Sequence, residues 1–145
     1  MAQALTEAVD GMEEKTKKLV KLRDRIIDGI LETVPYTRLN GHRTERLPNN
    51  TSFCFRYIEG ESLLLSLDMM GYVVSSGSAC TSGSLDPSHV LLGIGLPHEI
   101  AHGSLRASLS EFTTEEEVDS FIKELVPIVQ RLRDMSPLYE ERGKE

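Results

Sequence analysis

Apolar residues recur at helical spacing along the first part of the chain, with charged residues between them. The pattern predicts a long amphipathic helix over residues 4–34. A helix of about 30 residues is roughly 45 Å long, which is longer than a small domain can cover. Its first turns contain few large apolar residues, so we expect part of the helix to pack against something other than this domain. The apolar positions are Leu5, Val9, Met12, Leu19, Val20, Ile26, Ile27, Ile30, Leu31 and Val34.

Four later segments have the pattern of short β-strands. Residues 51–57 alternate small or polar residues with aromatic ones. The polar stretch before them, residues 36–48, contains an Asn-Gly turn signal and predicts a short strand followed by a loop. Residues 72–74 predict another short strand. Residues 104–110 place Leu and Ala on one face and Arg106 on the other, so we expect this arginine to stand on a strand.

Apolar segments between and after these strands predict four more helices. Two of them are short, and the last, rich in apolar residues at helical spacing, closes the domain. The first is expected over residues 59–70 and is stopped by Gly71. The second is capped by Asp86 or Ser84 and extends through Leu92, and the third runs from Pro97 to Gly103. The last begins at a capping box formed by Thr113 with Glu116 or by Thr114 with Glu117.

Strands separated by helices predict an α/β or α+β fold, in which a small sheet is covered on one face by helices. A chain of 145 residues has the size of one domain with a core. We expect the long helix over residues 1–34, a small domain over residues 35–135 and a polar, frayed tail over residues 136–145.

Composition narrows the range of partners. The net charge is −7, from 16 Lys and Arg against 23 Asp and Glu, so no basic surface for nucleic acid is indicated. No apolar run approaches the roughly 20 residues that span a bilayer, and no signal pattern is present, so we expect a cytoplasmic protein.

The two cysteines fit reduced thiols. Cys54, between Phe53 and Phe55, is expected to be a small apolar residue of the core.

The second cysteine, Cys80, lies in a run from Ser75 to Ser84. All the remaining residues of this run are Ser, Gly, Ala or Thr. Glycine frees the backbone, and such small side chains bury little apolar area. We name residues 75–84 the thiol loop. Its composition suits a thiol that moves between two sites, and equally allows a flexible loop with an incidental cysteine.

Several ordered motifs resemble the long-loop branch of the cysteine desulfurases, a pyridoxal-phosphate family of the class V aminotransferase superfamily. This branch serves iron–sulfur cluster assembly and nitrogen fixation. The similar motifs are the thiol loop, the Arg-Ala-Ser-Leu strand around Arg106, Glu59–Leu63, Phe112–Glu117 and Arg131–Leu138. The resemblance implies the C-terminal small domain of a fold-type I pyridoxal-phosphate-dependent transferase.

The resemblance also implies roles for individual residues. Cys80 would be the catalytic thiol, which takes sulfur from L-cysteine as a persulfide and leaves L-alanine. Arg106 would bind the carboxylate of the substrate, although a surface ion pair is the alternative. Family members form homodimers and deliver sulfur to an iron–sulfur scaffold protein near their C-terminal segment, here residues 136–139. The flexible loop that moves the thiol would include Ser76, Gly77, Ser78, Ala79, Thr81 and Ser82.

The motifs that resemble the family include no residue that would hold pyridoxal phosphate. The family binds this cofactor with a lysine in a large domain, and no Ser-x-His-Lys pattern occurs here. We therefore expect a large domain supplied by a separate chain or removed from this one, and no turnover by this chain alone. Two alternatives stay open: a stand-alone persulfide carrier or scaffold-docking module, and a non-catalytic fragment.

The segment His98-Glu99-Ile100-Ala101-His102 formally matches the H-E-x-x-H zinc motif. Such sites need a long helix and a third ligand, whereas Pro97 and Gly103 bound a segment of little more than one turn. A zinc hydrolase is thus a remote alternative, and we expect no metal. His102, four positions before Arg106, could tune that site or pack beneath Arg106, and a structural role is favoured over a catalytic one. His42 and His89 are expected to be surface residues.

Overall fold

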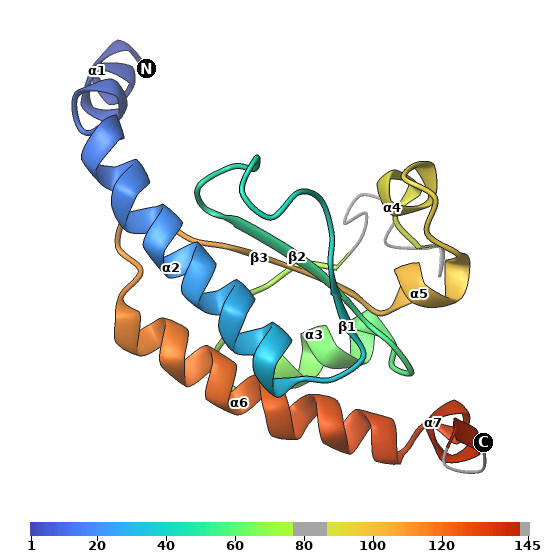
Figure 1. Cartoon of the computed structure of the whole chain (residues 1–145). Helices are drawn as coiled ribbons and strands as arrows, with labels where there is room; N and C mark the ends of the chain where they lie inside the picture. The colour runs from blue at the N-terminus through green and yellow to red at the C-terminus, as the bar shows by residue number, and fades with distance from the viewer. Residues whose placement is uncertain (77–86, 143–145) are drawn as a thin grey trace.

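The computed structural model describes residues 1–76 and 87–142, which form helices around one small sheet (Figure 1). The helices are α1 (Ala2–Asp10), α2 (Met12–Thr33), α3 (Gly60–Asp68), α4 (His89–Gly93), α5 (His98–His102), α6 (Glu115–Asp134) and α7 (Pro137–Arg142). The strands are β1 (Thr37–Leu39), β2 (Asn50–Phe55) and β3 (Ser104–Ser108). This mixed architecture confirms the expected fold class.

The three strands form an antiparallel sheet in the order β1-β2-β3. The register pairs Phe53 of β2 with Leu39 on one side and with Leu105 on the other. Because side chains alternate along a strand, these three residues share one face of the sheet. The opposite face carries Arg38 and Arg106, which lie on the two outer strands.

The apolar face of the sheet packs against α2, α3 and α6, which together enclose the main core. Helices α2 and α6 run along each other, as Figure 1 shows, and both contribute apolar residues to this core. The side chains with no more than 1% exposure in this core include Leu22, Ile27, Ile30, Phe53, Phe55, Leu63, Leu67, Leu105, Leu125 and Val129. A second, smaller cluster, in which Cys54 packs against Leu91, Leu96 and Ala101, covers part of the other face beneath α4 and α5.

Ion pairs add to the contact between α2 and α6. Arg25 of α2 makes a two-pronged contact with Asp119 of α6, with both nitrogen–oxygen distances at 2.6 Å, and Lys21 pairs with Glu115. These side chains are partly exposed, so each pair contributes little stability alone. Their position along the two helices fixes how far α2 is shifted relative to α6.

The long N-terminal helix is divided in two. A break at Gly11 separates α1 from α2, because glycine has low helix propensity and leaves the last carbonyls of α1 without a continuing turn. No residue of α1 is buried, and Leu5, Val9 and Met12 are exposed. Figure 1 shows α1 projecting away from the sheet, so the first turns pack on nothing within the described residues.

Three other expectations differ from the structure. Residues 72–74 form no strand, and only an isolated bridge joins Ser75 to Arg106. The tail is not frayed throughout, since α7 forms over residues 137–142. The helix expected from Asp86 or Ser84 begins later, at His89 with Ser88 as its N-cap, and both expected caps lie outside the described residues. Within the described residues, no helix is long and apolar enough to cross a membrane.

Candidate functional site

Arg106 stands on β3 with its side chain exposed, as the alternation in residues 104–108 predicted. Its backbone is held on both sides. It pairs with Ser52 of β2, and on the outer edge its N–H donates to the Ser75 carbonyl at 2.6 Å while Ser75 N–H donates to the Arg106 carbonyl at 3.0 Å. The guanidinium makes no hydrogen bond or ion pair with any described residue, so it is available to an anion.

The strand that carries Arg106 is fixed by a close backbone approach at Gly103. A Cβ at this position would collide with the carbonyl oxygen of Phe55. Glycine lets the Phe55 N–H donate to the Gly103 carbonyl at 2.8 Å, which starts the β2–β3 pairing. The position of Arg106 three residues later therefore depends on backbone contacts rather than on its own side chain.

The thiol loop begins next to Arg106. Ser75 is hydrogen-bonded to Arg106 as above, and Ser76, the last described residue before the gap, is half-buried. Cys80 lies five residues after Ser75 in the sequence. The expected catalytic Cys80 and the expected loop residues Gly77, Ser78, Ala79, Thr81 and Ser82 lie outside the described residues.

Cys54 is fully buried, which confirms its expected place in the core. Its Sγ lies 3.3 Å from Nδ2 of Asn40. Burial raises the pKa of the Cys54 thiol, while the hydrogen bond from Asn40 and the nearby Arg38 charge oppose that change. Less thiolate and no access make this cysteine a poor nucleophile.

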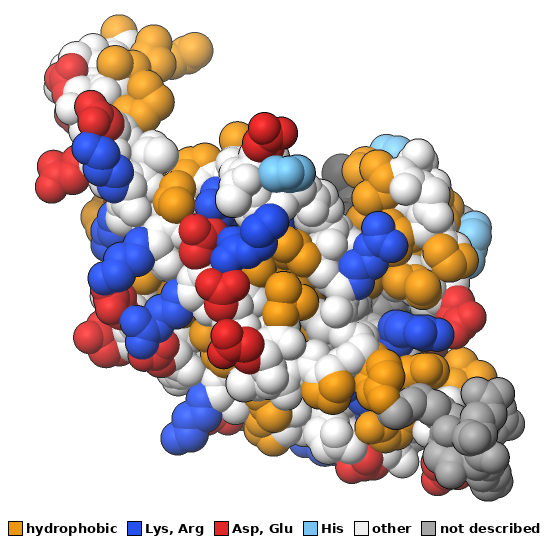
Figure 2. Space-filling view, viewed as in Figure 1, with side chains coloured by type: hydrophobic (Ala, Val, Ile, Leu, Met, Phe, Trp, Pro, Cys, Tyr) orange, Lys and Arg blue, Asp and Glu red, His pale blue; other side chains and the backbone are white. Residues whose placement is uncertain are grey.

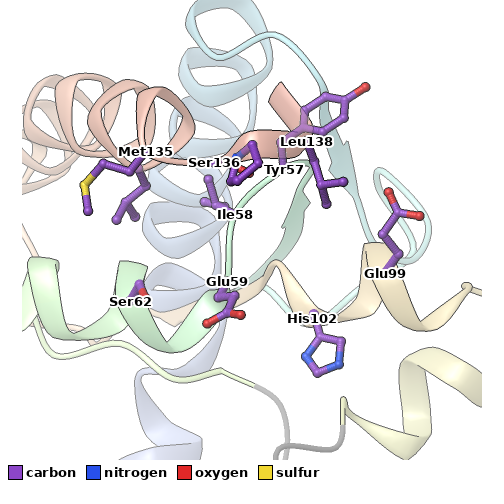
Figure 3. Close-up of a pocket in the computed structure, with 11 residues that line it drawn as sticks. Tyr57, Ile58, Glu59, Ser62, Glu99, His102, Met135, Ser136 and Leu138 are labelled. Carbon is purple, nitrogen blue, oxygen red and sulfur yellow. The ribbon is translucent and has the colours of Figure 1, made fainter. Parts of the chain in front are cut away.

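Sequence reasoning missed a groove of about 680 Å³ at the end of the domain near α7. Figure 3 shows its walls: Glu59 and His102 lie on one side and Tyr57 and Leu138 on the other. Its residues are Tyr57, Ile58, Glu59, Ser62, Glu99, His102, Leu132, Met135, Ser136, Pro137 and Leu138. We call this the α7 groove. These residues come from three stretches of the chain, 57–62, 99–102 and 132–138, so no local pattern could reveal the groove, although Ser136, Pro137 and Leu138 already belonged to the expected docking segment.

The α7 groove combines apolar walls with negative charge. Met135 and Leu138 are 74% and 54% exposed and add apolar surface to its walls. Neither Glu59 nor Glu99 forms an ion pair with any described residue, and no Lys or Arg lines the groove. The groove therefore suits an apolar side chain flanked by basic groups. In Figure 2, hydrophobic side chains gather next to the C-terminal end of the chain.

The histidines of the H-E-x-x-H segment lie on α5, which has five residues. The ring centroids of His98 and His102 are 6.5 Å apart. Within residues 1–76 and 87–142, no group of three or more His, Cys, Asp or Glu side chains is placed to hold a metal ion. The geometry gives the zinc interpretation no support. His102 is exposed and lines the α7 groove instead of packing beneath Arg106.

The small sheet with its helices, and the exposed Arg106 bridged to Ser75, can be compared with known proteins. The chain belongs to the aminotransferase class-V family, whose pattern matches residues 3–121.

Its relatives include cysteine desulfurases. It is 54% identical over 138 residues to the cysteine desulfurase IscS of Methanosarcina thermophila, covering 95% of this chain and 34% of that protein. It is 47% identical over 140 residues to the cysteine desulfurase NifS of Azotobacter vinelandii, covering 97% of this chain and 35% of that protein. The chain thus spans about a third of the length of these relatives.

The fold is also similar to a solved NifS-like protein, with a TM-score of 0.78 and 32% identity, covering 90% of this chain and 32% of that one. A second NifS-like protein, from Rickettsia africae, matches with a TM-score of 0.72 and 28% identity. The second match covers 83% of this chain and 31% of that one, so both solved proteins are about three times the length of the matched part.

The described residues do not fit a pyridoxal-phosphate site. The lysines at the N-terminal helix are engaged on its surface: Lys15 pairs with Glu111, Lys17 with Glu13 and Lys21 with Glu115. No lysine lines the α7 groove. No step of chemistry on this cofactor is therefore assigned to these residues.

Proposed function

We propose that this chain is the thiol-bearing C-terminal part of a cysteine desulfurase, which takes sulfur from L-cysteine onto Cys80 and delivers it for iron–sulfur cluster assembly. The observation that carries the proposal is the 47–54% identity to IscS and NifS cysteine desulfurases across almost the whole chain, thiol loop included. Pyridoxal phosphate, which that chemistry uses, would be bound by a large domain not present among these residues.

In the proposed reaction the Cys80 thiolate attacks the sulfur of bound L-cysteine. A sulfur–sulfur bond forms and the bond between that sulfur and Cβ of the substrate breaks. The electron pair of the broken bond goes to Cβ, which takes up a proton, so the products are a persulfide on Cys80 and L-alanine. The thiolate is the competent nucleophile in such a step.

Arg106 would bind the substrate carboxylate. Its exposed guanidinium has no partner among the described residues, and a planar guanidinium can donate two parallel hydrogen bonds to a carboxylate. The ladder between Arg106 and Ser75 also ties the start of the thiol loop to the strand that would hold the substrate. This connection supports a joint role for Arg106 and Cys80.

The α7 groove would receive the sulfur acceptor, an iron–sulfur scaffold protein. Its apolar walls and its carboxylates Glu59 and Glu99, which pair with no described residue, fit a partner surface with an apolar side chain beside Lys or Arg. In this proposal residues 1–34 connect the small domain of residues 35–135 to the cofactor-binding domain. The complete enzyme would be a cytoplasmic homodimer.

The test compares the two cysteines in the enzyme reconstituted with its cofactor-binding domain. Cys80→Ser should abolish persulfide formation and alanine release, while Cys54→Ser is the matched control and should leave both largely intact. Loss of activity in Cys54→Ser with activity retained in Cys80→Ser would overturn the assignment. A chain that accepts sulfur on Cys80 from another protein, with no cofactor-binding partner, would instead establish a persulfide carrier.

A further inference from the structure

Arg133, near the end of α6, is the largest of the fully buried side chains, with 1% exposure. Its Nε donates to the Arg56 carbonyl at 3.2 Å. Its Nη2 has no hydrogen-bond partner among the described residues, and no described carboxylate forms an ion pair with it. Burial lowers the pKa of Arg133. A buried guanidinium without a counterion is costly, so its surroundings must offset that cost.

Aromatic rings surround this guanidinium. Its carbon lies 5.8 Å from the ring centroids of both Tyr36 and Tyr139. Tyr57 joins the two rings, because its centroid is 5.9 Å from that of Tyr36 and 5.6 Å from that of Tyr139. The negative faces of aromatic rings attract a cation, and more strongly where water is excluded. We call Arg133 and these three tyrosines the aromatic clasp.

Two members of the aromatic clasp have backbone conformations that non-glycine residues rarely adopt. The φ angles of Tyr36 and Tyr57 are 55° and 70°. Such left-handed residues persist only where the surrounding structure holds them, and they concentrate at functional sites. Here both turns bring a tyrosine ring to Arg133, one immediately before β1 and the other just after β2.

The aromatic clasp reaches α7 through Tyr139. This helix has six residues, and a helix this short is not stable without tertiary contacts. Pro137 and Leu138, the neighbours of Tyr139, line the α7 groove, and so does Tyr57 from the opposite segment. The contact of Tyr139 with Arg133 and Tyr57 therefore sets the distance between two walls of the groove.

We propose that Arg133 is a positioning residue that holds α7 in place through Tyr36, Tyr57 and Tyr139, so that the α7 groove is formed before a partner binds. The use of this groove by a sulfur acceptor rests on the proposed function, whereas the clasp itself does not. Arg133 is not one of the residues that line the groove and acts through the tyrosines.

The clasp is tested on the chain alone. Three of its four tyrosines belong to the clasp and it has no tryptophan, so tyrosine near-UV circular dichroism reports on the clasp. Arg133→Met and Tyr139→Leu should each weaken this signal and raise amide exchange of Tyr139 and Glu140 at least tenfold, with the far-UV spectrum retained. Tyr139→Phe keeps the ring and should preserve protection. Tyr72→Phe, outside the clasp, is the matched control.

Unchanged α7 exchange in a folded Tyr139→Leu variant would overturn the proposal, and this variant still decides the question if Arg133→Met does not fold. The use of the groove is tested in the reconstituted enzyme, with an iron–sulfur scaffold protein from the same cells and with dithiothreitol as acceptors. Tyr139→Leu should slow transfer to the protein at least tenfold. Arg133→Met, which changes no lining residue of the groove, should slow it likewise and leave alanine release with dithiothreitol unchanged. Lost α7 protection with normal transfer to the protein would support the clasp and overturn the acceptor site.

Discussion

Replacing Arg106 separates substrate binding from folding, because its side chain and its backbone have different partners. The backbone pairs with Ser52 and Ser75, whereas the guanidinium is exposed and contacts no described residue by hydrogen bond or ion pair. Arg106→Ala should therefore leave the free energy of unfolding within about 0.5 kcal/mol of the parent chain, as is usual for exposed positions. Urea unfolding of the 145-residue chain measures this.

The expected effect on activity is much larger. A hydrogen bond to a charged group contributes about 1.5–3 kcal/mol net. Its loss corresponds to a rise of about tenfold to 150-fold in the cysteine concentration required for half-maximal rate. Arg106→Lys should recover little of this loss, because an ammonium group cannot make the two parallel bonds of a guanidinium.

The assay is alanine release against cysteine concentration in the enzyme reconstituted with its cofactor-binding domain. Arg38→Ala is the matched control, because Arg38 is an exposed arginine on the same face of the sheet at the opposite outer strand. Its Michaelis constant should equal that of the parent. Equal constants for Arg106→Ala and the parent, or equal increases for both arginine variants, would refute the assignment of Arg106 to the substrate.

Three further predictions concern stability and thiol reactivity. Leu125→Ala should lower the free energy of unfolding by about 2–5 kcal/mol, because Leu125 is fully buried. Leu47→Ala, at a 69% exposed position, should change it by less than about 0.5 kcal/mol. Urea unfolding compares the two variants, and equal losses would contradict the described core. Thr114→Ala removes the capping box with Glu117 and should lower the free energy of unfolding by about 0.5–2 kcal/mol in the same assay. Thr114→Ser should retain most of that stability. An unchanged free energy in Thr114→Ala would mean that the cap does not stabilise α6. Because burial raises the pKa of Cys54, iodoacetamide at neutral pH should modify it only after unfolding, as peptide mass spectrometry would show, and rapid labelling of the folded chain would disprove its burial.

Local patterns in the sequence were sufficient for the main helices and strands. Apolar spacing predicted α2 and α6, and alternation over residues 104–108 correctly assigned Leu105 to the core face and Arg106 to the other. These features follow from periodicity, which depends only on neighbouring residues. The capping box was predicted with two alternatives, and the structure selects Thr114 with Glu117.

Other features depended on contacts between distant segments. A single bridge joins Ser75 to Arg106, in place of the strand expected over residues 72–74. Hydrogen bonding in this segment depends on the position of β3 in the folded chain, which local sequence does not determine. The residues of the α7 groove are brought together from the connection between β2 and α3, from α3 and α5, and from α6 and α7. No spacing rule connects Glu59 with His102 or Leu138.

The sequence by itself determined the helical and extended segments, the family resemblance and the choice of Cys80 and Arg106 as candidates. Only the tertiary structure decided that Arg133 is buried, since an arginine in an amphipathic helix is normally assigned to the solvent face. Its burial depends on aromatic rings from the turn before β1, the turn after β2 and α7, which meet only after the chain has folded. Periodicity encodes which face of an element is apolar, whereas the partners that meet at that face are set by packing of the whole domain.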